Sequence, residues 1–135
     1  MAEETWMQTL IDSAAKNTAI KAQVGVNVWQ GQSNISKDLT PLCPFLDFTR
    51  MPWGRDILSY YMGEGLVKME TWHASSVAKA QKSYQVAYEE LTNAHIKGAT
   101  YDLAIYEFQA PEDSPGWENK CFRSSGLLKV VWVKR

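Results

Sequence analysis

The sequence is short of the residues that build metal sites and disulfide frameworks. It contains only two cysteines, Cys43 and Cys121, and only two histidines, His73 and His95. Neither histidine has a second histidine or a cysteine at the close spacing that lets a zinc site form from one local segment. Without a secretory signal pattern, the cysteines are predicted to be reduced, buried thiols, with a disulfide as the alternative. We therefore expect no metal and no cofactor.

The chain also lacks long apolar runs and an excess of charge of either sign. No apolar stretch approaches the roughly 20 residues that cross a bilayer. The 14 basic and 15 acidic residues leave a formal charge of -1, which provides no basic field for nucleic-acid phosphates. Neither a membrane nor sequence-specific nucleic acid is expected as a partner.

What the sequence does contain is the composition of a folded domain. Its residues are 45% hydrophobic and 21% charged, which is close to ordinary globular proteins and far from disordered ones. A chain of 135 residues is long enough to bury one core. We therefore expect a single domain that spans residues 1–135.

Two segments have apolar residues at the three- and four-residue spacing of amphipathic helices. The first runs from Glu3 to Gln23. The second starts after Ser75 or Ser76, either of which can cap it, and continues to Gly98, which offers a left-handed C-cap. His95 would then lie in the last turn of this helix.

Strand signals fill most of the remaining chain. Alternating residues predict strands at Val24–Trp29, Phe45–Met51, Leu66–Ala74, Thr100–Gln109 and Cys121–Lys134, with Ile57–Met62 either a strand or a helical turn. Turn-forming residues predict connections at Gln30–Pro44, Gly63–Gly65 and Ala110–Asn119. This order predicts an α+β fold with one mainly antiparallel sheet and two helices packed on one of its faces.

Residues for catalysis do not form a recognisable pattern. Ser75 and Ser76 lack the Gly-x-Ser-x-Gly turn that exposes a nucleophile. A general acid and base could come from four carboxylates, but one sequence does not show which of them meet in space: Asp47, Asp56, Glu64 and Glu70. We therefore predict no catalytic residues and a chain that is not an enzyme.

The aromatic residues suggest binding instead. Three of the six tryptophans stand beside turn-rich segments, and two arginines lie near them in the sequence. Tryptophan and arginine are enriched at binding hot spots, whereas packing at the edge of the core is the alternative. The predicted protein interface, on loops and strand edges, consists of Trp29, Trp53, Arg55, Trp117 and Arg123.

The order of elements resembles that of the tail terminator and head-to-tail joining proteins of tailed bacteriophages. The segments that carry the resemblance are Ala22–Gly25, Pro44–Phe48, Val67–Ser76, Tyr101–Phe108 and Phe122–Trp132. Pro52–Gly65 departs from the pattern because it is longer and more aromatic. The resemblance implies a homo-oligomeric ring, often a hexamer, that caps the tail tube and receives the head connector. It also implies a place in the virion, reached after assembly in the host cytoplasm.

Two other interpretations stay open. A small-molecule-binding or enzymatic domain of the nuclear-transport-factor-like cone shape would line an apolar pocket with aromatic side chains. The sequence offers Trp53, Tyr60, Tyr61 and Trp72 for this purpose. A protein-binding adaptor that forms no ring is the third interpretation.

Overall fold

The computed structural model describes residues 5–31, 43–51, 61–116 and 121–135. Over these ranges the chain forms three helices and a curled six-stranded sheet, which confirms the predicted α+β class. The helices are α1 (Trp6–Lys16), α2 (Thr18–Val24) and α3 (Val77–Thr92). The strands are β1 (Val28–Gln30), β2 (Phe45–Met51), β3 (Met62–His73), β4 (Ile96–Lys97), β5 (Tyr101–Gly116) and β6 (Cys121–Lys134).

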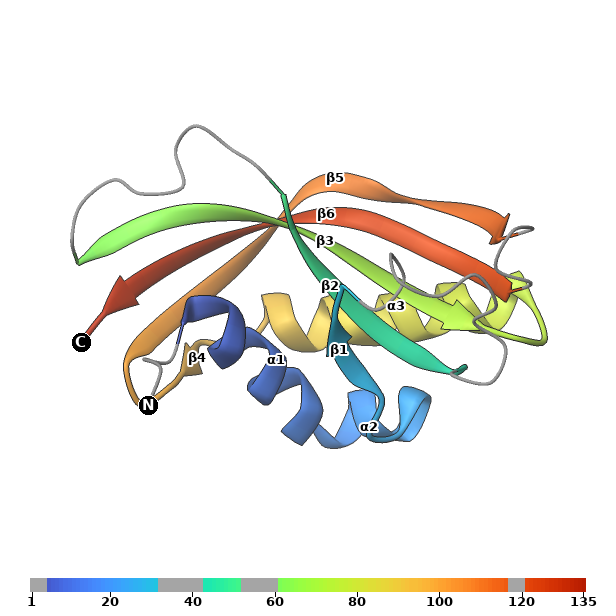
Figure 1. Cartoon of the computed structure of the whole chain (residues 1–135), viewed down its shortest axis with the longest axis horizontal. Coiled ribbons are helices and arrows are strands. Elements are labelled where there is room, and N and C mark those ends of the chain that lie inside the picture. The colour runs from blue at the N-terminus through green and yellow to red at the C-terminus, as the bar shows by residue number, and fades with distance from the viewer. Residues whose placement is uncertain (1–4, 32–42, 52–60, 117–120) are drawn as a thin grey trace.

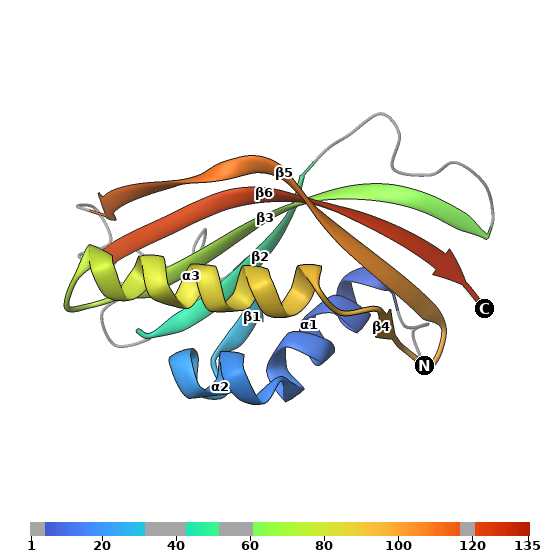
Figure 2. The same ribbon diagram turned by 180° about the vertical axis from the view of Figure 1, so that it is seen from behind.

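The sheet is mainly antiparallel and has the order β1-β2-β3-β6-β5-β4. Among the described strands, only β1 and β2 pair in parallel. Figures 1 and 2 show the helices gathered on the same side of the sheet, and α3 lies lengthwise along it. Helix α3 contacts β3, β5 and β6, whereas α1 contacts β1, β4 and β5. We call the side that carries the helices the inner face and the other side the outer face.

The first predicted helix, Glu3–Gln23, is wrong in one respect because the chain breaks it at Asn17. The backbone of Asn17 is extended, and its side chain accepts a hydrogen bond from the Ile20 N–H at 3.0 Å. An asparagine that caps in this way starts a new helix, α2. Gly25, at φ 67°, ends α2 in a conformation that glycine adopts easily. The strand predicted at Val24–Trp29 therefore begins later, at Val28.

The second predicted helix begins as expected but ends earlier. The Ser76 side chain accepts the Lys79 N–H, so Ser76 is the N-cap of α3. The helix stops at Thr92, and the chain then forms the short strand β4. Gly98 is therefore not a helix C-cap, and His95 is not in the last helical turn. Gly98 instead lies in the β4–β5 connection, where its N–H donates to the Tyr101 carbonyl.

The strand predictions are confirmed for β2 and β6 and extended for two others. Strand β3 starts at Met62, so the turn predicted at Gly63–Gly65 is wrong; these residues pair with β6 inside the sheet. Strand β5 runs on to Gly116, which corrects the loop predicted from Ala110. Pro111 is compatible with this because β5 lies near the edge of the sheet, where an outward-facing residue needs no N–H donor. The undecided Ile57–Met62 segment lies mostly outside the described residues.

Strands β5 and β6 pair along almost their whole lengths, but β5 contains extra residues. The register shifts between Glu107 and Gln109 and again between Gln109 and Glu112. Bulges of this kind bend a strand and increase its twist. Figure 1 shows β5 starting beside β4, crossing the view and then arching along the rim of the sheet.

The hydrophobic core fills the space between the inner face and the helices. Every other residue of β3 and β6 points into it, as the strand period requires. Helix α3 contributes a stripe at three- and four-residue spacing. The residues of these three elements in the core are Val67, Met69, Ala80, Tyr84, Ala87, Leu91, Leu128, Val130 and Trp132.

Tyr84 of helix α3 lies directly over Gly126 of β6. A Cβ atom on Gly126 would overlap the Tyr84 hydroxyl and lie 3.0 Å from Cζ of the same ring. The hydroxyl is buried and has no hydrogen-bond partner in the described part of the chain. Burial, together with the charge of Glu107 and the nearby Tyr88, raises the pKa of Tyr84. The absence of a side chain at Gly126 therefore sets the distance between α3 and the sheet.

Gly126→Ala is expected to lower the free energy of unfolding by about 1–3 kcal/mol, because the added methyl group displaces Tyr84. Tyr84→Phe should be nearly neutral, since the deleted hydroxyl makes no hydrogen bond to a described residue. The double variant should lose less stability than the sum of the two changes, because removal of the hydroxyl makes room for the methyl group. Urea unfolding of the four proteins measures this coupling, and strictly additive losses would contradict it.

Candidate functional site

The outer face carries a group of charged side chains from β2, β3 and β6. We call Asp47, Lys68, Glu70 and Arg123 the charged cluster. Asp47 and Glu70 are directly opposite each other on β2 and β3, and both are buried, at 0% and 1% exposure. Glu70 is bridged by Lys68, with Nζ 3.5 Å from Oε1, and by Arg123, with Nη1 3.3 Å from Oε2.

This arrangement balances charge inside the sheet. Like charges on opposed strand positions destabilise a sheet, so the two carboxylates need nearby cations. Lys68 and Arg123 supply them, and each engages a different oxygen of Glu70. With both oxygens engaged and the side chain enclosed, Glu70 is held as a structural ion pair. A substrate in solution does not reach it directly.

A second group adjoins the charged cluster. We call Trp29, Cys43, Phe45, Trp72 and Cys121 the aromatic–thiol cluster. The Phe45 and Trp72 rings stack, with their centroids 6.0 Å apart. The centroids of the Trp29 and Phe45 rings are 5.3 Å apart. The Cys43 and Cys121 Sγ atoms are 3.0 Å apart. These contacts bring the start of β2, the end of β3 and the start of β6 together.

Arg123 joins the two clusters. Its guanidinium lies 5.6 Å from the centroid of the Trp72 ring and also bonds to Glu70. Such a cation–π contact adds to the ion pair. The position of Arg123 is therefore determined by its own chain before any partner arrives.

The predicted interface residues are only partly placed. Trp29 and Arg123 both lie at the aromatic–thiol cluster, where Trp29 is half-buried and Arg123 partly exposed. Trp53, Arg55 and Trp117 lie outside the described residues. Sequence reasoning missed the pairing of Asp47 with Glu70. Its signal was present, because Phe45 and Asp47 alternate on one strand as Glu70 and Trp72 do on another, but the register was needed to see it.

Arg123→Ala is expected to lower the free energy of unfolding by about 1–3 kcal/mol, because it removes a charged hydrogen bond from buried Glu70. The matched control is Arg135→Ala, which removes an exposed ion pair with Asp102 and should cost at most about 1 kcal/mol. Chemical denaturation of both variants provides the measurement. Equal losses would show that the Arg123–Glu70 pair is worth no more than a surface contact.

The inner face contains a serine–histidine contact that resembles a nucleophile and its base. The His73 Nε2 atom lies 2.7 Å from Ser83 Oγ, and Ser83 Oγ donates to Gln23 Oε1 at 3.4 Å. Burial, followed by the nearby charge of Lys79, lowers the pKa of His73. Ser83 is only 2% exposed and lies within α3. The contact therefore ties α2 and α3 to the end of β3 and does not present a nucleophile to solvent.

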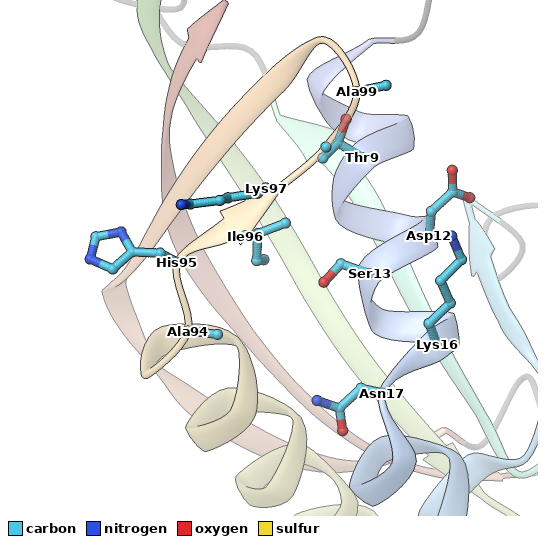
Figure 3. Close-up of a pocket in the computed structure, with 11 residues that line it drawn as sticks. Thr9, Asp12, Ser13, Lys16, Asn17, Ala94, His95, Ile96, Lys97 and Ala99 are labelled. Atoms are coloured by element: carbon cyan, nitrogen blue, oxygen red, sulfur yellow. The ribbon is translucent and has the colours of Figure 1, made fainter. Parts of the chain in front are cut away.

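A groove of about 620 Å³ lies between α1 and the β4 region. One wall consists of α1 residues at helical spacing, including Thr9 and Ser13, and the other consists of residues 94–99. In Figure 3 Ser13 faces the space between the walls, whereas His95 points away from α1. Asp12 and Lys16 lie beside each other along α1 in the same view. The polar side chains do not converge on one point, as a catalytic constellation would.

The described ranges contain no group of three or more histidine, cysteine, aspartate and glutamate side chains placed to hold a metal ion. None of the described helices combines the length and apolar character that a membrane span needs. No protein-family model matches the chain, and no curated protein matches it.

Proposed function

We propose that the chain is a structural assembly protein that forms a homo-oligomeric ring through the outer edge of β5. In line with the resemblance in its sequence, the ring would terminate a bacteriophage tail tube and join it to the head connector. The chain would then act in the virion without catalytic residues or a cofactor. The observation that carries this proposal is the long open edge of β5.

Among the described strands, β5 has a paired neighbour on one side only over most of its length. The neighbouring strand β4 pairs with Asp102 and Leu103 alone, whereas β5 continues to Gly116. No strand in the described part of the chain lies beyond it. An open edge of this kind presents backbone groups that can pair with another chain.

The first part of this edge has the features of a pairing site. From Ala104 to Ala110 the sequence contains no proline, and two large aromatic side chains are exposed there, Tyr106 at 53% and Phe108 at 51%. Farther along, Pro111, Glu112 and Asp113 protect the edge in the way natural proteins prevent unwanted pairing. A partner strand would therefore pair with 104–107, where the edge is regular, and Phe108 would border this contact at the first register shift.

The occupant we propose is a second copy of the chain, bound head to tail. If β5 paired with β5 of another copy, the contact would be isologous and would close a dimer. A contact between β5 and a different surface of the next copy is heterologous and closes a ring when the rotation fits. The opposite end of the sheet offers such a surface, since β1 pairs only with β2 among the described strands.

The small-molecule pocket receives less support from the structure. Trp72 is packed in the aromatic–thiol cluster and Tyr61 is exposed, so neither lines the groove between α1 and β4. Trp53 and Tyr60 lie outside the described residues. The groove is polar, whereas a pocket for a drug-sized ligand is mostly apolar.

Size-exclusion chromatography with light scattering tests the proposed ring. The expected result is a closed oligomer of about six copies whose mass stays constant over a range of protein concentrations. A monomer at every concentration, even when mixed with tail-tube protein, would contradict the proposal. A dimer would contradict the head-to-tail arrangement, and a stable monomer that binds another protein would favour the adaptor.

A further inference from the structure

The two cysteines are close in space although they are far apart in the sequence. Cys43 and Cys121 are separated by 78 positions, yet their Sγ atoms lie 3.0 Å apart. A disulfide bond is about 2.05 Å long, so a movement of about 1 Å would bring the sulfurs to bonding distance. Both residues are thiols in this structure.

The order of the strands and the packing around them bring the two sulfur atoms together. Cys121 begins β6, and Cys43 lies just before β2. These strands are not neighbours, because β3 lies between them. Phe45 is opposite Trp72 on β3, and Trp72 is opposite Arg123 on β6. The sulfurs therefore meet beside the end of β3 and are held by the packed aromatic rings of the same cluster.

We propose that Cys43 and Cys121 form an oxidisable dithiol site, which closes to an intramolecular disulfide on reaction with a low-molecular-weight disulfide such as oxidised glutathione. Cys43 is half-buried and Cys121 is buried. A reagent therefore reaches Cys43 first, and Cys121 acts as the resolving thiol.

The reaction runs in two exchange steps. The Cys43 thiol loses its proton, and its thiolate attacks one sulfur of glutathione disulfide, which releases one glutathione thiolate. Cys121 then loses its proton and attacks the Cys43 sulfur, which releases the second glutathione. The two protein thiols are oxidised to one disulfide, and one glutathione disulfide is reduced to two thiols.

The product would join β6 to the residue two positions before β2, although β3 separates these strands in the sheet. It would close a loop between positions 43 and 121 and restrict the unfolded chain. Oxidation should therefore raise Tm on the order of 10 °C, from typical values for disulfides and for the temperature shift of a domain of this size. It should also fix the start of β2 relative to β6.

The full-length protein, equilibrated in glutathione buffers of increasing oxidised fraction, tests the site. Samples are quenched with an alkylating reagent and weighed by mass spectrometry. We expect a product that lacks two hydrogen atoms, takes up no label and keeps the mass of a single chain. The effective concentration of the thiol pair should be at least about 100-fold higher in native buffer than in guanidinium, because folding holds the sulfurs together.

The variants Cys43→Ser and Cys121→Ser distinguish the intramolecular disulfide from other oxidation products. Each variant should stop at a thiol or a glutathione adduct and show no rise in Tm under oxidising conditions. Three outcomes would overturn the proposal: accumulation of the glutathione adduct on the unmodified sequence, disulfides only between chains, or equal effective concentrations in the folded and unfolded states. All of them can be measured whether or not the chain forms a ring.

Discussion

Phe108→Lys is expected to abolish assembly and leave a folded monomer. Phe108 lies on the proline-free part of the β5 edge and is half exposed. A lysine there must lose water when another strand pairs, and charged side chains on edges are the usual means of preventing such contacts. Phe108 belongs to neither hydrophobic cluster of the described residues, so the subunit is expected to stay folded. Light scattering should report the mass of one chain, with an unfolding transition close to that of the unmodified protein.

Two companion variants make the result specific. Tyr106→Glu, on the same edge, should also weaken assembly, while its carboxylate replaces the contact between the Tyr106 ring and Lys129. Gln85→Lys is the control, because Gln85 is exposed on α3 and belongs to neither β5 nor β1. The proposed interface would be wrong if both β5 variants assembled normally. It would also be wrong if Gln85→Lys disrupted the oligomer to the same extent.

Leu91→Ala is expected to lower the free energy of unfolding by about 2–5 kcal/mol, the range for a leucine deleted from a packed core. Leu91 lies in the last turns of α3 and is 2% exposed. The loss has two parts. The deleted side-chain atoms no longer contribute the free energy of their burial, and the cavity that remains under the helix adds a further cost. Assembly should fail together with the fold, in contrast to the β5 variants.

Gln85→Ala on the exposed side of the same helix is the matched control for Leu91→Ala. It removes only the surface hydrogen bond to Glu89, so its effect should stay within about 0.5 kcal/mol. Urea unfolding and light scattering of both variants give the comparison. A Leu91→Ala protein that unfolds like the Gln85→Ala protein would show that α3 is not packed on the sheet as described.

Local patterns in the sequence predicted the elements whose signals were self-contained. Strands β2 and β6 have the predicted bounds, and Ser76 caps α3 as its position before an apolar stripe indicated. The break at Asn17 was missed because the apolar stripe continues across it. Glycine permits turns, so the sequence predicts one at Gly63–Gly65, but pairing with β6 holds these residues in a strand.

The candidate site depended on contacts that a single sequence does not contain. Asp47 meets Glu70, and Cys43 meets Cys121, only because β2 and β6 both lie beside β3. Spacing along the chain indicates which residues of one strand share a face, but strand order and register decide which residues of two strands meet. Trp29 and Arg123 could be singled out by residue type, but their packing against Phe45 and Trp72 required the fold.

The bend of the β5–β6 hairpin is linked to a difference in the number of residues between its two strands. Between Glu107 and Glu112, five steps along β5 accompany three steps along β6, from Leu128 to Ser125. Strand β5 is therefore longer than its partner, with 16 residues against 14 in β6. The longer strand of such a pair lies on the outside of the bend. Because side chains alternate, two additional residues return the strand to its original phase, whereas one would turn every later side chain to the opposite face. The curvature of this hairpin is therefore insensitive to most single substitutions and is open to change through insertions or deletions of residues in pairs.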